Sequence, residues 1–259
     1  MLEVTYVSLG ENCLIDEILK DFKLRKETFP FGSGRFNIEY INQICQEDFQ
    51  HFLDDRYLKY AIADNIQVVK NTYYPHEFDI YEFTVCDGVE FTHHDVFQPK
   101  LKESMQRKVD RFKEAVRQPQ SYVFLYYYRY SEKRNVSIIL SQLEHWVKWV
   151  ETLSGVTPKL IFIHQQLVQE KSQRNFETLS HYWGKEVVFY TQEIWTGNDN
   201  WAAAPDRDLL EDLFNAAPFM KFIYGDDWRK EKWRRQQQKI RGWIPKVKFT
   251  IKKWMRIQS

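Results

Sequence analysis

The pattern of hydrophobic and polar positions predicts four buried strands. Residues 4–9 are mostly β-branched or apolar, and the stretches 122–128, 160–163 and 187–190 are apolar or aromatic at every position. Strands without polar alternation are typical of a parallel sheet that is covered on both faces.

Between these strands, apolar positions recur at helical spacing. Asn12 follows the first strand and is placed to cap a helix with one apolar face, formed by Leu14, Ile15, Ile18, Leu19 and Phe22. Further helices are predicted from Asn37 to Cys45, after Pro99, before Gly155 and near residues 172–183. This alternation predicts an α/β fold, with a mostly parallel sheet and helices on both faces.

Residues 66–97 interrupt the alternation. Short extended runs at 66–69, 81–85 and 89–91 are separated by turn residues, and Asp87-Gly88 is a favourable hairpin turn. We therefore expect an antiparallel excursion from the main sheet in this segment.

Charge is distributed unevenly, although the net charge of the chain is only +1. Residues 229–259 hold twelve Lys or Arg and one acidic residue, Glu231, so residues 1–228 carry a net charge of −10. We therefore expect an α/β domain over residues 1–228, followed by a basic helical tail over residues 229–259.

Residues 240–257 of this tail have the periodicity of an amphipathic helix, with one apolar face formed by Ile244, Val247, Ile251, Trp254 and Met255. A basic amphipathic helix with an interfacial tryptophan favours peripheral contact with an anionic membrane surface. The alternatives are that the tail docks on its own acidic domain or on a partner subunit. Nucleic acid is the least favoured partner, even though tryptophans interleave with the basic residues.

Features of the whole chain favour a cytoplasmic protein. Its three cysteines (Cys13, Cys45 and Cys86) are widely spaced and odd in number, which argues against a disulfide framework. We expect no signal peptide at the N-terminus, and no stretch reaches the roughly 18 consecutive apolar residues of a membrane span. The tail would then contact the inner face of the membrane.

Ligands of parallel α/β sheets bind beyond the carboxyl ends of the strands. The predicted strands place Gly10, Arg129, His164 and the loop 192–201 at that edge. We therefore expect the first three residues to bind substrate, together with Trp195, Asn198 and Trp201 of the loop.

Cys13 is the strongest candidate for chemistry. If Asn12 caps the following helix, the thiol lies in the first turn, where the helix macrodipole favours the thiolate and lowers the thiol pKa. A nucleophile on a tight strand-to-helix turn is open to attack, and Asn12 or backbone N–H groups near Gly10 are placed to polarise a carbonyl. The alternative is a small buried residue behind a turn glycine.

A thiol nucleophile needs a base, which is usually histidine. In the titratable cluster at residues 93–95, His94 is the candidate base and Asp95 the residue that orients it. A solvated polar turn is the alternative interpretation of this cluster, and His164 is the second-choice base. Since cysteines and histidines lack the compact spacing of a metal site, we expect no metal and no cofactor.

Two segments form a recognisable pair of motifs. The first is Ser-Leu-Gly-Glu-Asn-Cys at residues 8–13, followed by Leu24-Arg25 and Pro30-Phe31, and the second is residues 91–97 around His94-Asp95. They resemble the Ser-Leu-Gly-x-Asn-Cys, Pro-Phe-Asp-Trp and Phe-x-His-Asp-Phe elements of a bacterial family of uncharacterised, papain-like cysteine peptidases. The resemblance covers residues 4–165 and implies a cysteine-dependent hydrolase.

The chain departs from that family at Gly32-Ser33, where the family has Asp-Trp. A carboxylate and an aromatic ring near the expected site are therefore missing. We expect a thiol-dependent hydrolase or acyltransferase with a peptide, small-molecule, acyl or sugar substrate, in the setting of surface-polysaccharide metabolism. The alternative is a non-catalytic binding module that kept the fold and lost the chemistry.

Overall fold

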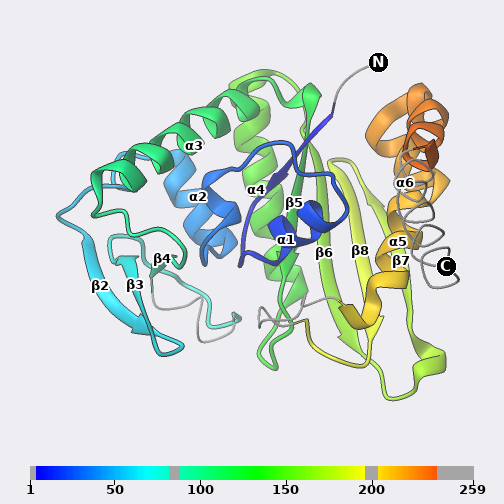
Figure 1. Cartoon of the computed structure of the whole chain (residues 1–259), viewed down its shortest axis with the longest axis horizontal. Helices are drawn as coiled ribbons and strands as arrows, with labels where there is room; N and C mark the ends of the chain where they lie inside the picture. The colour runs from blue at the N-terminus through cyan, green and yellow to red at the C-terminus, as the bar shows by residue number, and fades with distance from the viewer. Residues whose placement is uncertain (1–3, 82–87, 196–203, 238–259) are drawn as a thin grey trace, which may run out of the picture. The chain divides into compact units, whose positions relative to one another are not determined.

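The computed structural model describes residues 4–81, 88–195 and 204–237, which contain two β-sheets (Figure 1). The strands are β1 (Thr5–Ser8), β2 (Leu58–Ala63), β3 (Ile66–Asn71), β4 (Val89–Phe91), β5 (Tyr122–Tyr128), β6 (Lys159–Leu167), β7 (Asn175–His181) and β8 (Gly184–Thr191). The α-helices are α1 (Leu14–Asp21), α2 (Ile38–Gln46), α3 (Pro99–Arg117), α4 (Val136–Ser154), α5 (Arg207–Asn215) and α6 (Ala217–Tyr224). Short 3₁₀ helices are η1 (Pro30–Gly32), η3 (Pro119–Ser121), η4 (Lys171–Gln173), η5 (Ala204–Asp206) and η6 (Gly225–Asp227).

The main sheet has the strand order β1-β5-β6-β8-β7. Its first four strands are parallel, and β7 pairs antiparallel with β8 at the edge. The second sheet is the antiparallel set β2-β3-β4, inserted between α2 and α3. This arrangement confirms the predicted α/β fold with an antiparallel excursion.

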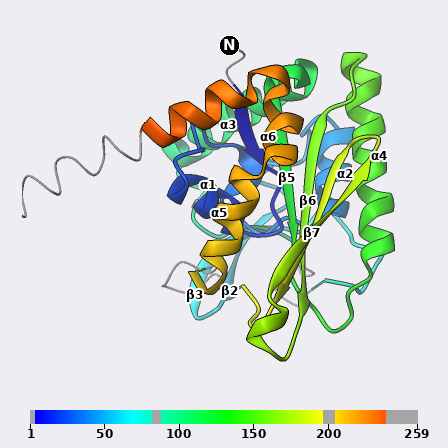
Figure 2. The same ribbon diagram turned by 90° about the vertical axis from the view of Figure 1, so that its right-hand side faces the viewer.

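Helices cover both faces of the main sheet, as expected from its apolar strands. Figure 2 shows α1 on one side of the sheet and α2 and α4 on the other. Pro99 is the first residue of α3, and Gly155 ends α4 in the left-handed conformation at φ 70°. Asn37 caps α2 by accepting a hydrogen bond from the Tyr40 N–H, at 2.9 Å.

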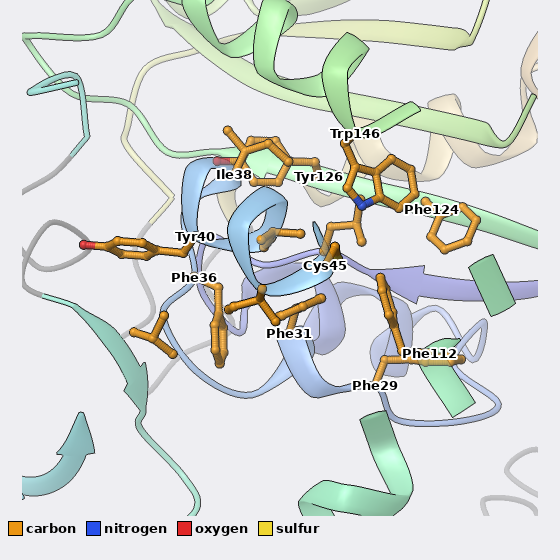
Figure 3. Close-up of a cluster of buried hydrophobic side chains, with 14 of the residues drawn as sticks. Phe29, Phe31, Phe36, Ile38, Tyr40, Cys45, Phe112, Phe124, Tyr126 and Trp146 are labelled. Carbon is orange, nitrogen blue, oxygen red and sulfur yellow. The ribbon is translucent and has the colours of Figure 1, made fainter. Parts of the chain in front are cut away.

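An aromatic cluster forms the core between η1, α2, α3 and β5 (Figure 3). Phe31 lies in its centre and is completely buried. The Phe31 ring centroid is 5.0 Å from that of Phe112, 5.3 Å from Phe36 and 5.8 Å from Phe49. Cys45 is buried in the same core, beside Trp146.

The helix predicted near residues 172–183 is wrong, because this segment forms the edge strand β7. Cross-strand pairs with β8 stabilise it: the Phe176 and Phe189 rings are 5.7 Å apart, and the Tyr190 hydroxyl donates to Glu177 at 3.1 Å. β7 is mostly exposed, so it lacks the apolar runs that identified the other strands.

Strand β2 was also not predicted from the sequence. It forms a hairpin with β3 through Asp64-Asn65, and both turn residues have positive φ, at 49° and 62°. The predicted run 81–85 and the turn at Asp87-Gly88 fall mainly on residues 82–87, outside the described residues.

By its contacts the chain divides into two compact units, and residues 4–209 lie within the larger one. Residues 210–237 belong to the other unit, where a helical stretch covers 228–237. In that stretch the buried Glu231 carboxylate pairs with Arg234 at 2.6 Å and Arg235 at 3.1 Å. The amphipathic part of the tail, residues 240–257, lies outside the described residues, so the tail boundary at residue 229 stays a prediction.

Within the described ranges, the structure contains no helix with both the length and the apolar composition needed to cross a membrane.

We expect Phe31→Ala to lower the free energy of unfolding by about 3–5 kcal/mol, because it removes a ring that is packed on all sides. Urea denaturation followed by circular dichroism measures this change. The matched control is Tyr182→Ala, at a side chain that is 61% exposed, where the change should stay within about 0.5 kcal/mol. Equal effects of the two substitutions would contradict a core centred on Phe31.

Candidate functional site

The turn between β1 and α1 has a backbone that only glycine fits at residue 10. Gly10 has φ +91°, and a Cβ atom there would lie 2.8 Å from the Phe36 carbonyl oxygen. The next residue is tied to the same segment, since the Phe36 N–H donates to the Glu11 carbonyl at 3.1 Å. The turn is therefore packed against the chain that leads into α2.

Glu11 connects this turn to the end of the neighbouring strand. Its carboxylate is completely buried, and Oε2 accepts a hydrogen bond from the Arg129 backbone N–H at 2.7 Å. Because β1 and β5 are adjacent and parallel, their carboxyl ends meet here. The predicted proximity of Arg129 to the Gly10–Cys13 turn is thus present in the structure.

Asn12 and Cys13 begin α1. The Asn12 Oδ1 atom accepts the Leu14 N–H at 2.9 Å, and Cys13 occupies the N-cap position, where its carbonyl accepts the Glu17 N–H at 3.0 Å. Cys13 is half-buried. Its thiol therefore lies at the start of the helix, one position before the predicted first turn.

The thiol pKa differs from the expectation. Burial raises the pKa of Cys13, and the nearby Glu17 carboxylate raises it further, whereas the Arg35 guanidinium lowers it. The expected lowering by the helix macrodipole is outweighed by burial and by the Glu17 and Asp16 carboxylates in the first turn of α1. Cys13 is consequently protonated at neutral pH.

His94 lies in a second polar group, together with Lys108 and Ser33. The Lys108 Nζ atom is 2.6 Å from His94 Nε2 and 3.2 Å from the Ser33 hydroxyl oxygen. Burial and the adjacent Lys108 ammonium lower the pKa of His94 to about 4. Burial likewise lowers the pKa of Lys108 to about 8. His94 is therefore neutral at pH 7, whereas Lys108 is still mostly protonated at that pH and reaches half-protonation near pH 8.

Asp16 lies close to both groups. Its carboxylate pairs with Arg25 at 2.5 Å, and its charge raises the pKa of Cys13 and of Lys108. Asp16 is also adjacent to Gly32, where a Cβ atom would meet Asp16 Oδ1 at 3.3 Å. A carboxylate from α1 thus stands beside the position that carries Asp in the resembling family.

The predicted dyad itself is not closed by a hydrogen bond: within residues 4–81, 88–195 and 204–237, none joins Cys13 to His94. Asp95 also has other partners, since its carboxylate accepts the Tyr60 hydroxyl at 3.3 Å and the Gln98 amide at 2.9 Å. Catalysis by Cys13 with His94, oriented by Asp95, stays a prediction.

A cavity of about 200 Å³ lies next to the His94 turn. Its walls come from the second sheet and from the turn that follows β4, and they include Tyr60, Val69, Phe91, Thr92 and His94. The cavity has apolar and polar sides, and it is smaller than the roughly 300–1,000 Å³ of sites for drug-sized ligands. It therefore fits a small group.

The remaining predicted residues lie elsewhere. His164 is buried, and its Nε2 atom lies 3.0 Å from Glu186, which also contacts His181 at 2.8 Å. Trp195 is completely buried against Tyr127 and Phe189, so it packs inside the protein and does not line an open cleft. Asn198 and Trp201 lie outside the described residues.

The strand order separates His164 from Cys13. His164 lies on β6, two strands from β1, and strands in a sheet are about 4.8 Å apart. Their backbones are therefore separated by roughly 10 Å across the sheet alone. His164 is instead paired with Glu186 in the interior, and its role as second-choice base stays a prediction.

Lys108, Asp16 and Ser33 were missed as candidate residues. The sequence pattern did contain an indication of Lys108, because this residue lies on the buried face of α3 together with Met105, Val109 and Phe112. A lysine on a buried helix face is uncommon and indicates a specific role. Within the described residues, no group of His, Cys, Asp and Glu is arranged to hold a metal ion.

Fold and site together define an α/β protein with a half-exposed cysteine at the first strand-to-helix turn and a buried Lys-His pair nearby. The sequence profile of the family described as "Putative papain-like cysteine peptidase (DUF1796)" matches residues 4–179. The chain therefore belongs to this family. No curated protein and no solved structure matches the chain.

The raised pKa of Cys13 predicts slow alkylation by iodoacetamide at pH 7, with a rate that still increases above pH 9, because only the thiolate reacts. Glu17→Gln should increase the rate at pH 7 severalfold, since it removes the carboxylate that opposes the thiolate. Peptide mass spectrometry of timed samples measures both rates.

Cys45 provides the internal control, because complete burial raises the pKa of its thiol further. It should stay unmodified while the protein is folded. A Cys13 rate that levels off below pH 8 would contradict the raised pKa.

Proposed function

We propose that this protein is a thiol-dependent hydrolase or acyltransferase, with Cys13 as nucleophile and His94 as general base. One observation carries the proposal: a half-exposed thiol lies at the start of α1, directly beyond a parallel strand. Membership of the cysteine-peptidase family supports the same role for the thiol.

The electrostatics of the site support the need for a base. A thiol with a raised pKa is a poor nucleophile at pH 7 unless a neighbouring group removes its proton. His94 is neutral at that pH and is therefore able to accept the proton. Its Nε2 atom faces Lys108 in this structure, so the proposal requires the ring to exchange Lys108 for the thiol when substrate binds.

In the proposed reaction, Cys13 Sγ forms a bond to the carbonyl carbon of an amide or ester, and the thiol proton passes to His94. The protonated His94 returns this proton to the departing amine or alcohol. Water, or a sugar hydroxyl in the acyltransferase case, then releases the acyl group from sulfur. The Asn12 NH₂ group is the candidate donor to the carbonyl oxygen, since Asn12 Oδ1 already accepts from Leu14.

We expect Cys13→Ser to lower turnover of peptide anilides by at least about 100-fold, because a serine hydroxyl is far less acidic than a thiol and gives up its proton to His94 much less readily. The melting temperature should change little, since a half-exposed side chain contributes little packing energy.

His94→Gln should lower turnover as well, and the matched variants Cys45→Ser and His93→Gln should not. Unchanged turnover in Cys13→Ser would leave the binding-module interpretation, with the fold retained and the thiol chemistry absent.

We also propose that residues 240–257 attach the protein to an anionic membrane surface, which would suit a substrate in surface-polysaccharide assembly. The support is the predicted helix, with its apolar face and its basic residues. Each basic residue near such a surface contributes about 1 kcal/mol.

Full-length protein should therefore sediment with vesicles of phosphatidylglycerol and not with vesicles of phosphatidylcholine. The double substitution Lys252→Glu and Lys253→Glu should weaken binding on the order of tenfold or more, and added salt should weaken it further. Equal binding to both lipids, or none to either, would refute membrane attachment.

A further inference from the structure

We propose that Ser33 is a second nucleophile of this protein and that Lys108 is its general base. The Lys108 Nζ atom lies 3.2 Å from Ser33 Oγ, which is within hydrogen-bond reach for proton transfer. The inference goes beyond the thiol chemistry, because Cys13 has no part in it. Its substrate class is a carboxylic ester.

Lys108 has the surroundings that a lysine base needs. Its side chain is only 6% exposed, on the face of α3 that packs against the core. Burial lowers the pKa of Lys108 to about 8; the Arg111 and Arg25 guanidiniums act in the same direction, and the Asp16 carboxylate acts against them. About half of the molecules therefore carry a neutral amine at pH 8, compared with less than about 1% for an ordinary lysine.

His94 positions that amine. The distance of 2.6 Å between Lys108 Nζ and His94 Nε2 is that of a strong hydrogen bond. Since burial and the Lys108 charge keep the imidazole neutral, Nε2 can accept an N–H from Lys108 while the nitrogen lone pair stays available to Ser33. His94 is thus a positioning residue in this reaction.

The backbone presents Ser33 rigidly. The residue follows η1, whose Phe31 is anchored in the aromatic core. On the other side, a Cβ atom at Gly34 would lie 2.2 Å from the Glu90 carbonyl oxygen, so the chain passes close to β4 there. Ser33 itself is half-buried.

A hollow adjoins the positioning residue. His94 lines the cavity of about 200 Å³ that is also lined by Tyr60 and Phe91. It offers space for part of a substrate beside the Lys108–His94 pair.

The proposed reaction needs only Ser33, Lys108, the substrate and water. Ser33 Oγ forms a bond to the carbonyl carbon, and its proton moves to the neutral Lys108 amine. The tetrahedral intermediate then breaks the bond to the leaving alcohol, which takes the proton from the Lys108 ammonium. Water, deprotonated by Lys108, forms a bond to the acyl carbon, the bond to Ser33 Oγ breaks, and Lys108 returns the proton to Oγ as the carboxylic acid leaves.

A fluorophosphonate probe tests the proposal on the full-length protein. Ser33 Oγ would form a bond to phosphorus, fluoride would leave with the serine proton, and peptide mass spectrometry would locate the adduct. We expect the adduct on Ser33 in the wild type and in Cys13→Ser, and its loss in Ser33→Ala. The matched control Ser131→Ala, at another half-buried turn serine, should keep the wild-type rate.

Lys108→Arg keeps a positive charge and cannot serve as a base, so labelling should slow by at least about 100-fold. The wild-type rate should also level off above pH 8, which tests the base without any substitution. No adduct on Ser33, loss of the adduct in Cys13→Ser, or a rate that continues to increase through pH 10 would each overturn the proposal. Failure of Cys13→Ser to change peptide-anilide turnover concerns only the thiol function, so the two results are distinguishable.

Discussion

The packing of Phe31 against Phe36, Phe49 and Phe112 holds together the segments that carry the candidate site. Phe112 lies one helical turn after Lys108 on the buried face of α3. The contact that buries the Phe112 ring therefore also fixes the position of Lys108. Phe36 contributes the carbonyl against which Gly10 packs, and Phe31 leads directly into Gly32 and Ser33. Three segments that are distant in the sequence thereby meet around one ring.

Buried charge is the second feature that organises the site. An ammonium ion taken out of water is costly unless polar partners compensate it, and Lys108 has His94, Ser33 and the field of Asp16. Burial lowers the pKa of both nitrogen groups, and the Lys108 ammonium lowers the pKa of His94 further. Such opposed titratable groups are concentrated at functional sites more than elsewhere in proteins.

Much of the fold was predictable because its parallel strands are apolar throughout and its helices have clear boundaries, such as Pro99 and Gly155. β7 was not, because an exposed edge strand carries no burial pattern and gains its stability from cross-strand pairs that only β8 supplies. The β1–α1 turn was identified correctly, whereas the direction of the Cys13 pKa shift was not. Desolvation depends on tertiary packing, which no local spacing records.

The position of β1 in its sheet has a consequence for dynamics. Among the described strands, β1 pairs with β5 alone. The pairing covers four residues of β1, with Thr5 opposite Tyr122 at one end and Ser8 opposite Leu125 at the other. The opening of so short a ladder does not require the strands beyond it to separate, so its free energy lies below that of global unfolding. The protection of the Thr5–Ser8 amides against hydrogen exchange is then a property separate from the stability of the core.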